Sequence, residues 1–241
     1  MISKFTQKLL NAGFNVVKPE ILEALPHDIK AFTQGLAFSQ GMLYESTGTE
    51  DASSLRRLDP ETGKIESLKT LSGHWGEGIA IQEGRIVQLT WHSGIAIVYD
   101  LADFSKLNEW SFAGEGWGLA AMDDGYVMTN GGGELIFRNQ NFDLIKTVMA
   151  RRKGLPLRWL NDLEYARERL LVHRLGDSFL YEIEPENGTI ARLIDGSELI
   201  RLAKPKGDEN VFNGIAYDKS TDTFFLTGKR WPLLFKVRIS P

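Results

Sequence analysis

The sequence contains no cysteine, which excludes disulfides, thiolate metal sites and a cysteine nucleophile. It has no apolar run of the roughly 18 residues that a membrane-spanning helix needs. The net charge is only −4, which argues against a nucleic acid or an anionic membrane as a partner. Histidine is also scarce, and the spacing of the four residues argues against a zinc site: they are His27, His74, His92 and His173.

The start of the chain has basic residues but no continuous apolar core of a signal peptide. We therefore expect a cytoplasmic protein by default, or a periplasmic or secreted one if an upstream signal has been removed. The apolar spacing of Ile2, Phe5, Leu9 and Phe14 predicts a short helix before the main fold.

The residues that are abundant favour short strands joined by tight turns. The 241 residues include 24 Gly, 13 Phe and 6 Trp, and the hydrophobic and charged fractions, 42% and 25%, are typical of a globular protein. No linker or low-complexity segment divides the chain. We therefore expect one all-β domain over residues 1–241.

A short sequence motif occurs five times, and in each copy a small residue is followed by alternating apolar residues. Its small residues are separated by 43, 40, 44 and 52 residues, and the fourth copy is degenerate. The copies are Phe32–Phe38, Trp75–Ile81, Glu115–Ala121, Trp159–Tyr165 and Val211–Tyr217, with Gly35, Gly78, Gly118, Asp162 and Gly214 at the small position. A strand-rich repeat of about 40 to 50 residues is typical of a β-propeller with one repeat per blade.

The sequence therefore predicts a five-bladed β-propeller. The expected blades cover residues 27–70, 71–110, 111–155, 156–200 and 205–241. The apolar stretch Ile21–Leu25 is expected to pair with the last blade and to close the ring. The longest step between repeats carries its extra residues in 202–210, which we expect to form a surface loop. A closed ring leaves few free edges, so a monomer is expected.

Equivalent positions of the blades should form a ring around the central channel. The residue before the small one differs in every copy, whereas a structural ring would repeat one residue type: these residues are Gln34, Glu77, Trp117, Asn161 and Asn213. Counting along the second strand of each repeat places Trp91 and Lys229 at the mouth of the same channel. The sequence therefore predicts a pocket where the blades converge.

Glu77 is the one acid among these five ring positions. Indoles beside it would desolvate the carboxyl group, raise its pKa and suit it to proton transfer near neutral pH. The plainer interpretation is a solvated turn residue, with Trp75, Trp91 and Trp117 packed between blades. Asn161 and Asn213 could equally satisfy backbone groups.

The chain also resembles the plant-type glutaminyl-peptide cyclotransferases, or glutamine cyclotransferases. The matching segments run in order across nearly the whole chain: they are 27–36, 43–48, 76–78, 88–91, 116–119, 160–164, 213–218 and 227–232. The resemblance implies a five-bladed propeller that converts the N-terminal glutamine of a peptide to pyroglutamate and releases ammonia, without a cofactor or catalytic metal.

The resemblance implies a catalytic group of Glu77, Asn161 and Lys229 and a substrate-binding wall that includes Phe32, Gln34, Trp91 and Trp117. Two further wall positions depart from the family pattern. Trp75 stands where the family typically has Phe, and Arg174 stands where it has Trp. Asp162 also replaces the Glu of the family motif, which is a milder change.

Two other functions stay open on the sequence. A calcium-dependent lactonase-like propeller could use oxygens of Glu77, Asn161 and Asn213. A non-catalytic peptide-binding propeller would be consistent with the change at Arg174. The first interpretation predicts sensitivity to a chelator, and the second predicts binding of a peptide without release of ammonia.

Overall fold

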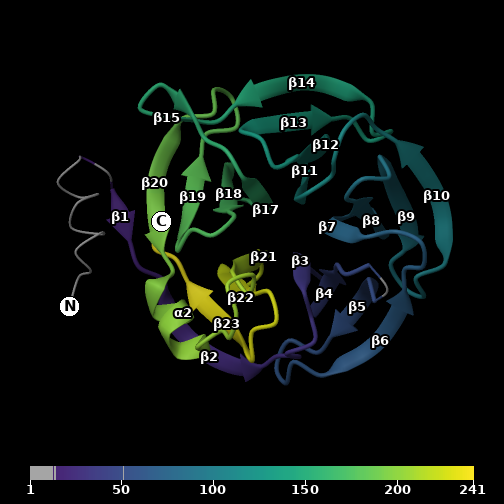
Figure 1. Ribbon diagram of the computed structural model, residues 1–241, viewed down its shortest axis with the longest axis horizontal. Coiled ribbons are helices and arrows are strands. Elements are labelled where there is room, and N and C mark those ends of the chain that lie inside the picture. The colour runs from purple at the N-terminus through teal and green to yellow at the C-terminus, as the bar shows by residue number, and fades with distance from the viewer. Residues whose placement is uncertain (1–12, 14, 51) are drawn as a thin grey trace.

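The computed structural model describes residues 13, 15–50 and 52–241, and Figure 1 shows five sheets arranged radially around one axis. This confirms the predicted five-bladed β-propeller. The expected N-terminal helix, carried by Ile2, Phe5, Leu9 and Phe14, lies outside the described residues. No described helix is long and apolar enough to cross a membrane.

In blades one to three the strands run outward from the axis in chain order, and neighbouring strands are antiparallel. Blade one contains β3 (Thr33–Ser39), β4 (Met42–Thr47), β5 (Ser54–Leu58) and β6 (Ile65–Thr70). Blade two contains β7 (Gly76–Gln82), β8 (Arg85–Thr90), β9 (Ile95–Asp100) and β10 (Lys106–Ser111). Blade three contains β11 (Leu119–Met122), β12 (Gly125–Met128), β13 (Glu134–Arg138) and β14 (Leu144–Met149).

The last two blades each take one strand from the start of the chain. Blade four contains β17 (Leu160–Ala166), β18 (Arg169–Arg174), β19 (Phe179–Ile183) and β20 (Ile190–Asp195), with β1 (Val16–Val17) parallel to β20. Blade five contains β21 (Phe212–Asp218), β22 (Thr223–Gly228) and β23 (Leu233–Arg238), with β2 (Glu20–Pro26) as its outer strand. The pairing of β2 with β23 closes the ring as predicted from Ile21–Leu25, whereas β1 was not predicted.

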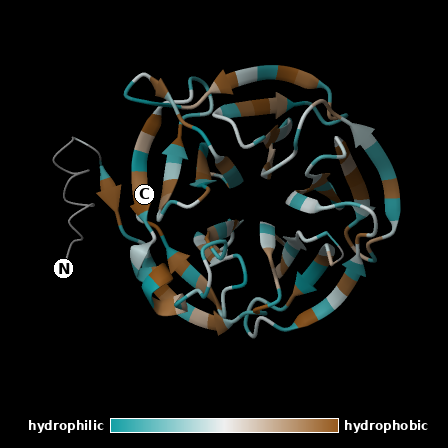
Figure 2. Ribbon diagram, viewed as in Figure 1, coloured by the Kyte–Doolittle hydropathy of each residue, from teal (hydrophilic) through white to brown (hydrophobic). Residues whose placement is uncertain are grey.

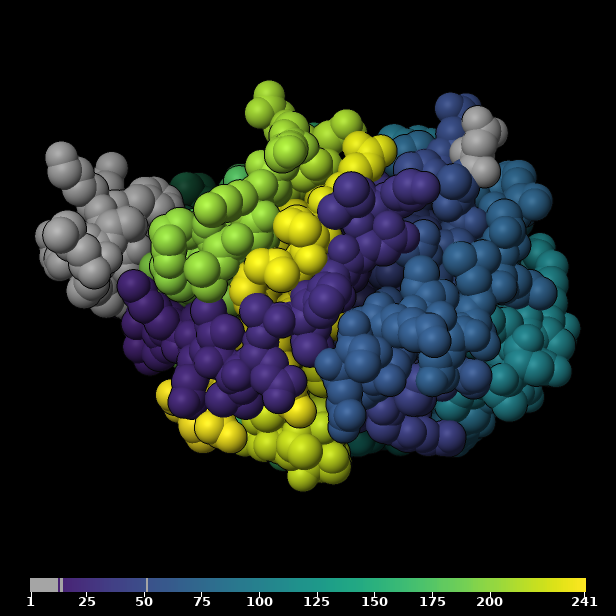
Figure 3. Space-filling model, turned by 90° about the horizontal axis from the view of Figure 1, so that it is seen from below, coloured from purple at the N-terminus to yellow at the C-terminus, as the bar shows by residue number. Residues whose placement is uncertain are grey.

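Two smaller elements connect the blades. A short hairpin of β15 (Arg151–Arg152) and β16 (Leu155–Pro156) links blades three and four. Helix α2 (Ser197–Ala203) follows blade four, so the residues 202–210 are not one loop, because Leu202 and Ala203 still belong to the helix. Figure 3 shows helix α2 and the residues that follow it, in lime, at the outer edge of the molecule beside β2.

The strand pattern follows from where each strand lies. Strands in the middle of a blade are covered on both faces and read as nearly continuous apolar runs, such as β9. Outer strands alternate between half-buried and exposed residues, as β6 does. Figure 2 shows teal and white, the colours of hydrophilic and intermediate residues, at ends of the innermost strands that face the axis.

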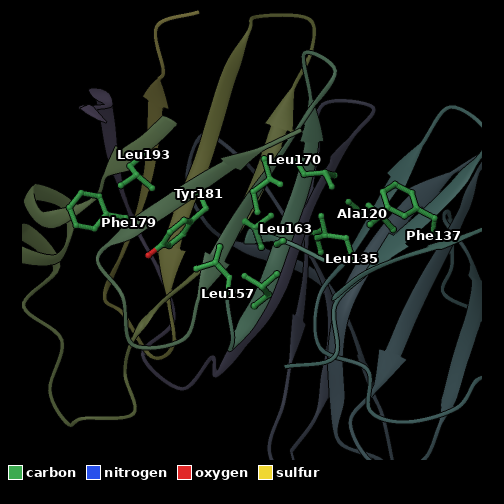
Figure 4. Packing of buried hydrophobic residues seen from close by; sticks show 14 residues of the cluster. Ala120, Leu135, Phe137, Leu157, Leu163, Leu170, Phe179, Tyr181 and Leu193 are labelled. Carbon is green, nitrogen blue, oxygen red and sulfur yellow. The ribbon is translucent and has the colours of Figure 1, made fainter. Parts of the chain in front are cut away.

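The core is divided among the five boundaries between blades, with one apolar cluster at each. Figure 4 shows the cluster between blades three and four, where Leu135 and Phe137 face Leu163, Leu170 and Tyr181. Because each blade is covered by both of its neighbours, the blades hold their innermost strands in fixed positions around the axis.

The innermost strands β3, β7, β11, β17 and β21 approach one another at the small residue of each repeat, which is glycine in every copy except the fourth, where it is Asp162. A Cβ added to Gly78 would lie 2.5 Å from the backbone nitrogen of Leu119 and 2.7 Å from the carbonyl carbon of Gly118. The backbone N–H of Gly78 donates to the Trp117 carbonyl at 2.6 Å, which links blades two and three directly. Only glycine allows this separation.

We therefore expect Gly78→Ala to destabilise the ring by about 2 kcal/mol or more, because the new methyl group meets rigid backbone rather than a movable side chain. Urea denaturation checks this through the free energy of unfolding. Gly84→Asn is the control, since Gly84 lies in an open turn at φ +74° that asparagine tolerates, and its cost should be below about 1 kcal/mol. Equal losses in the two variants would contradict the close-approach explanation.

Candidate active site

A cavity of about 120 Å³ lies where the five blades converge. Every blade contributes to its wall, which consists of Phe32, Gln34, Trp75, Glu77, Trp91, Trp117, Asn161, Leu175 and Lys229. Eight of the nine residues predicted for the site are therefore in the wall, and Arg174 is not. The geometry follows from the repeat, because Gln34, Glu77, Trp117 and Asn161 precede the small residue in four successive copies.

Glu77 is the acid of this cavity and is almost completely buried, with 4% of its surface exposed. The side-chain N–H of Gln34 donates to Glu77 Oε1 at 2.8 Å. Burial raises the pKa of Glu77 well above its usual range, although the Lys229 ammonium opposes the shift, and the carboxylate of Asp162 adds to it. This is the environment of a proton-transfer group rather than of a solvated turn residue.

Lys229 brings a buried positive charge to the same cavity. Its pKa is lowered by burial, while Glu77 and Asp162 act in the opposite direction. Its Nζ lies 4.6 Å from the centroid of the Phe32 ring, where the face of the aromatic ring attracts the cation. A buried ammonium next to a buried acid can stabilise negative charge that develops on a bound molecule.

Two amide oxygens of wall residues lack a hydrogen-bond partner within the part of the chain that the structure describes. Gln34 Oε1 and Asn161 Oδ1 are buried and have no hydrogen-bond partner among the residues that the structure describes. Because the amide nitrogen of Gln34 is engaged by Glu77, its oxygen is fixed as an acceptor. Unpaired buried acceptors are costly, so they indicate a ligand that carries N–H donors.

The aromatic part of the wall is rigid. Trp75 packs edge-on against Trp91, with centroids 5.3 Å apart, and against Phe32 at 6.3 Å. The indole N–H groups of Trp91 and Trp117 both donate to Glu115 Oε2 at 2.9 Å. The sequence analysis missed this role of Glu115, for which its position two residues before Trp117 was the available signal.

The structure corrects the prediction for Arg174. Its Nε donates to the carbonyl of Arg158 at 3.0 Å, and its Nη1 lies 3.3 Å from Asp177, so the guanidinium is held outside the cavity. Leu175, which the sequence analysis did not single out, lines the wall instead. The polar group of Arg174 finds these partners at the rim, whereas the apolar side chain of Leu175 can lie against the indoles.

Asn213 is the ring residue that does not reach the cavity. Its Nδ2 donates to the carbonyl of Thr33 at 3.0 Å, so it links blades five and one through the backbone. The oxygen set proposed for calcium in the lactonase alternative is therefore not assembled, and the Lys229 cation occupies the wall beside Glu77 and Asn161. Nor do any three His, Cys, Asp or Glu groups gather as metal ligands within the described part of the chain.

A buried ion network supports Phe32 and Lys229 from behind. His27 Nδ1 donates to the carbonyl of Trp231 at 2.9 Å, and its Nε2 lies 3.0 Å from Glu45 Oε1. Burial alone would lower the pKa of His27, but the Glu45 carboxylate raises it. Burial alone would raise the pKa of Glu45, but His27 holds it low. The imidazolium therefore ties the segment that leads to Phe32 to the loop that follows Lys229.

The model of the glutamine cyclotransferase family matches residues 2–239. The chain belongs to the glutamine cyclotransferase family. This membership confirms the resemblance drawn from the sequence motifs.

Two relatives agree with this membership. The chain is 31% identical over 237 residues to a glutaminyl-peptide cyclotransferase of Arabidopsis thaliana, covering 95% of this chain and 74% of the relative. It is also similar to the crystal structure of Myxococcus xanthus glutaminyl cyclase, with a TM-score of 0.88 and 34% identity, covering 93% of this chain and 97% of that one. Both comparisons extend over the blades that build the cavity of this glutamine cyclotransferase.

We expect His27→Ala to destabilise the protein by about 1 to 3 kcal/mol, because it removes the closest cation from the buried Glu45, which keeps Arg56 Nη1 at 3.6 Å and the Thr33 hydroxyl at 2.7 Å. The stabilisation from His27 is complete below the pKa of an unfolded histidine and is lost as the pH rises through its raised folded pKa. Denaturant unfolding across this pH range should therefore show a decline in the wild type that His27→Ala lacks.

His74→Ala is the control, because His74 is partly exposed and bonds only to Ser93 Oγ among the described residues. A wild-type stability that is flat across this pH range, or equal losses in the two histidine variants, would contradict the role of the buried network.

Proposed function

We propose that this chain converts the N-terminal glutamine of a peptide to pyroglutamate and releases ammonia. One observation carries the proposal: the cavity holds a single buried acid with a raised pKa, Glu77, beside a buried ammonium and two unpaired amide oxygens. Membership of the glutamine cyclotransferase family and the names of both relatives support the same reaction.

The reaction needs one proton to move between two nitrogens. The α-amine of the substrate, whose pKa is roughly 8, attacks in its neutral form and forms a bond to its own side-chain carboxamide carbon. The amine nitrogen then loses a proton, and the departing amide nitrogen must gain one before the C–N bond breaks and ammonia leaves. The ionised form of Glu77, which burial makes a stronger base by raising its pKa, accepts the first proton and delivers it to the second nitrogen, so it ends in its starting state.

The other polar groups bind the substrate around this shuttle. Gln34 Oε1 is placed to accept a hydrogen bond from the α-amine, because its own amide N–H already holds Glu77. Lys229 stabilises the negative charge that develops on the carboxamide oxygen during the attack. Asn161 completes the wall on blade four and can hold the substrate amide.

The aromatic wall supplies orientation and excludes water. A cavity of about 120 Å³ is smaller than a typical ligand pocket and suits a single folded side chain. Holding the glutamine in a ring-like conformation brings the amine close to the carboxamide carbon. The entropy of ordering the flexible side chain is then lost on binding and no longer adds to the reaction barrier. Exclusion of water by Trp75, Trp91 and Trp117 keeps hydrolysis to glutamate from competing.

All wall residues come from one chain, so we expect the monomer to be active on peptides and proteins that begin with glutamine. The proposed reaction assigns no step to a cofactor. A peptide-binding protein without activity could use the same aromatic wall, but binding alone does not need a desolvated acid beside Lys229.

We expect Glu77→Gln to lower the rate of cyclisation by about 10²- to 10⁴-fold, because the amide cannot carry the proton. Mass spectrometry of a glutamine-initiated peptide measures the loss of ammonia. The variant should remain folded: since burial raises the pKa of Glu77, its charge weakens the fold as the pH rises above the usual glutamate range, and the substitution removes that penalty.

Two controls accompany this experiment. A chelator should leave the wild-type rate unchanged, whereas a lactonase-type calcium site would lose activity. Glu66→Gln changes an acid on outer strand β6 and should cyclise the peptide at the wild-type rate. Near wild-type turnover by Glu77→Gln would overturn the assigned role of Glu77, and a wild type that binds the peptide without releasing ammonia would overturn the proposed function.

A further inference from the structure

An exposed indole stands next to the mouth of the cavity. Trp159 is 51% exposed, and its ring lies 6.3 Å from the ring of the wall residue Trp117 at a tilt of 43°. The other large apolar side chains that are exposed in the described part of the chain are aliphatic: Ile29, Leu68, Leu107, Leu144, Ile145 and Leu155. Trp159 itself is not part of the cavity wall.

The backbone holds Trp159 in a conformation that tryptophan rarely adopts. Its φ is +67°, in the left-handed region, where a bulky side chain is strained. Two backbone hydrogen bonds maintain this strain, one from Trp159 N–H to the Gly131 carbonyl at 2.9 Å and one from Leu175 N–H to the Trp159 carbonyl at 2.8 Å. Strain that is maintained in this way often marks a functional position.

The same contacts connect Trp159 to the wall. Leu175 lines the cavity, and Gly131 packs so closely on Trp117 that an added Cβ would lie 2.6 Å from its indole. Arg174, which lies outside the cavity, holds the preceding peptide through the Arg158 carbonyl at 3.0 Å. The indole of Trp159 is therefore fixed relative to the wall and is presented to solvent beside it.

The size of the cavity determines which part of a substrate peptide lies beside the Trp159 indole. About 120 Å³ accommodates the glutamine, so the rest of a substrate peptide must leave through the mouth. We propose that Trp159 is a specificity-determining residue, which binds the side chain of the second residue of the substrate and favours flat aromatic side chains there. This inference rests on the proposed function and adds the substrate class of the site. Stacking or edge-on packing on the indole provides the selectivity.

The test compares the peptides Gln-Phe-Ala and Gln-Gly-Ala. We expect wild-type kcat/KM to be roughly three- to tenfold higher for Gln-Phe-Ala, as an aromatic pair provides. Trp159→Gly should remove this preference and leave kcat/KM for Gln-Gly-Ala nearly unchanged. Glycine accepts the left-handed backbone without strain, so this variant keeps the loop that alanine would distort. Trp159→Phe should retain most of the preference.

Leu155→Ala is the matched control, since Leu155 is 73% exposed on β16 in the connection that leads to Trp159, and it should not change the ratio. A wild type without preference, a preference that persists in Trp159→Gly, or an equal fall for both peptides would overturn the inference. The equal fall would assign Trp159 a purely structural role.

A binding experiment separates this inference from the proposed function. In a Glu77→Gln background, calorimetry should show the same roughly three- to tenfold preference for Gln-Phe-Ala in the Kd ratio, and Trp159→Gly should remove it. Absence of ammonia release from both peptides by the wild type, with the binding preference intact in the Glu77→Gln background, would contradict the proposed function alone. Turnover of both peptides without a binding preference would contradict the inference alone.

Discussion

The close approach of the five innermost strands is the constraint on which the rest of this structure depends. Gly35 lies against Gly78, Gly78 against Gly118, and Gly118 against Asn161 and Asp162, so a side chain at any of these glycines would force the strands apart. The fourth repeat has Asp162 instead, whose buried carboxyl group accepts from the backbone N–H of Ile215 at 3.0 Å and thereby joins blades four and five. With the strands this close, the residues that precede the small positions converge, and four of them form a cavity.

The sequence predicts the blades and the cavity because the repeat is regular in its spacing but varies in residue type at the position before the small residue. Regular spacing of the small residues predicts the blades, and the change of residue type at the preceding position predicts that this ring is a site. The strands of the blades are short and separated by Gly and Pro turns, so their order follows from the chain. Ring closure by Ile21–Leu25 was predictable for a related reason, since an unpaired outer strand on the last blade would be a free edge.

What the sequence could not predict depends on side-chain direction. A shift of one residue along a strand end reverses the direction of the side chain, so the family motif placed Arg174 in the wall where the structure has Leu175. Asn213 occupies a ring position, but it turns to the carbonyl of Thr33. The bond from Trp91 to Glu115 and the His27–Glu45 pair join residues from different segments, and no local pattern reports such contacts. Only the closeness of Glu115 to Trp117 was visible in the sequence.

The central claim is that convergence of the blades keeps Glu77 desolvated and therefore protonated above the usual glutamate range. Isotope-edited infrared spectroscopy of the carboxyl stretch, measured against pH and assigned by subtracting Glu77→Gln, tests this directly. The protonated carbonyl band of Glu77 should persist well above the pH at which exposed glutamates ionise, because burial raises its pKa. Ionisation of Glu77 together with the exposed glutamates would contradict the account.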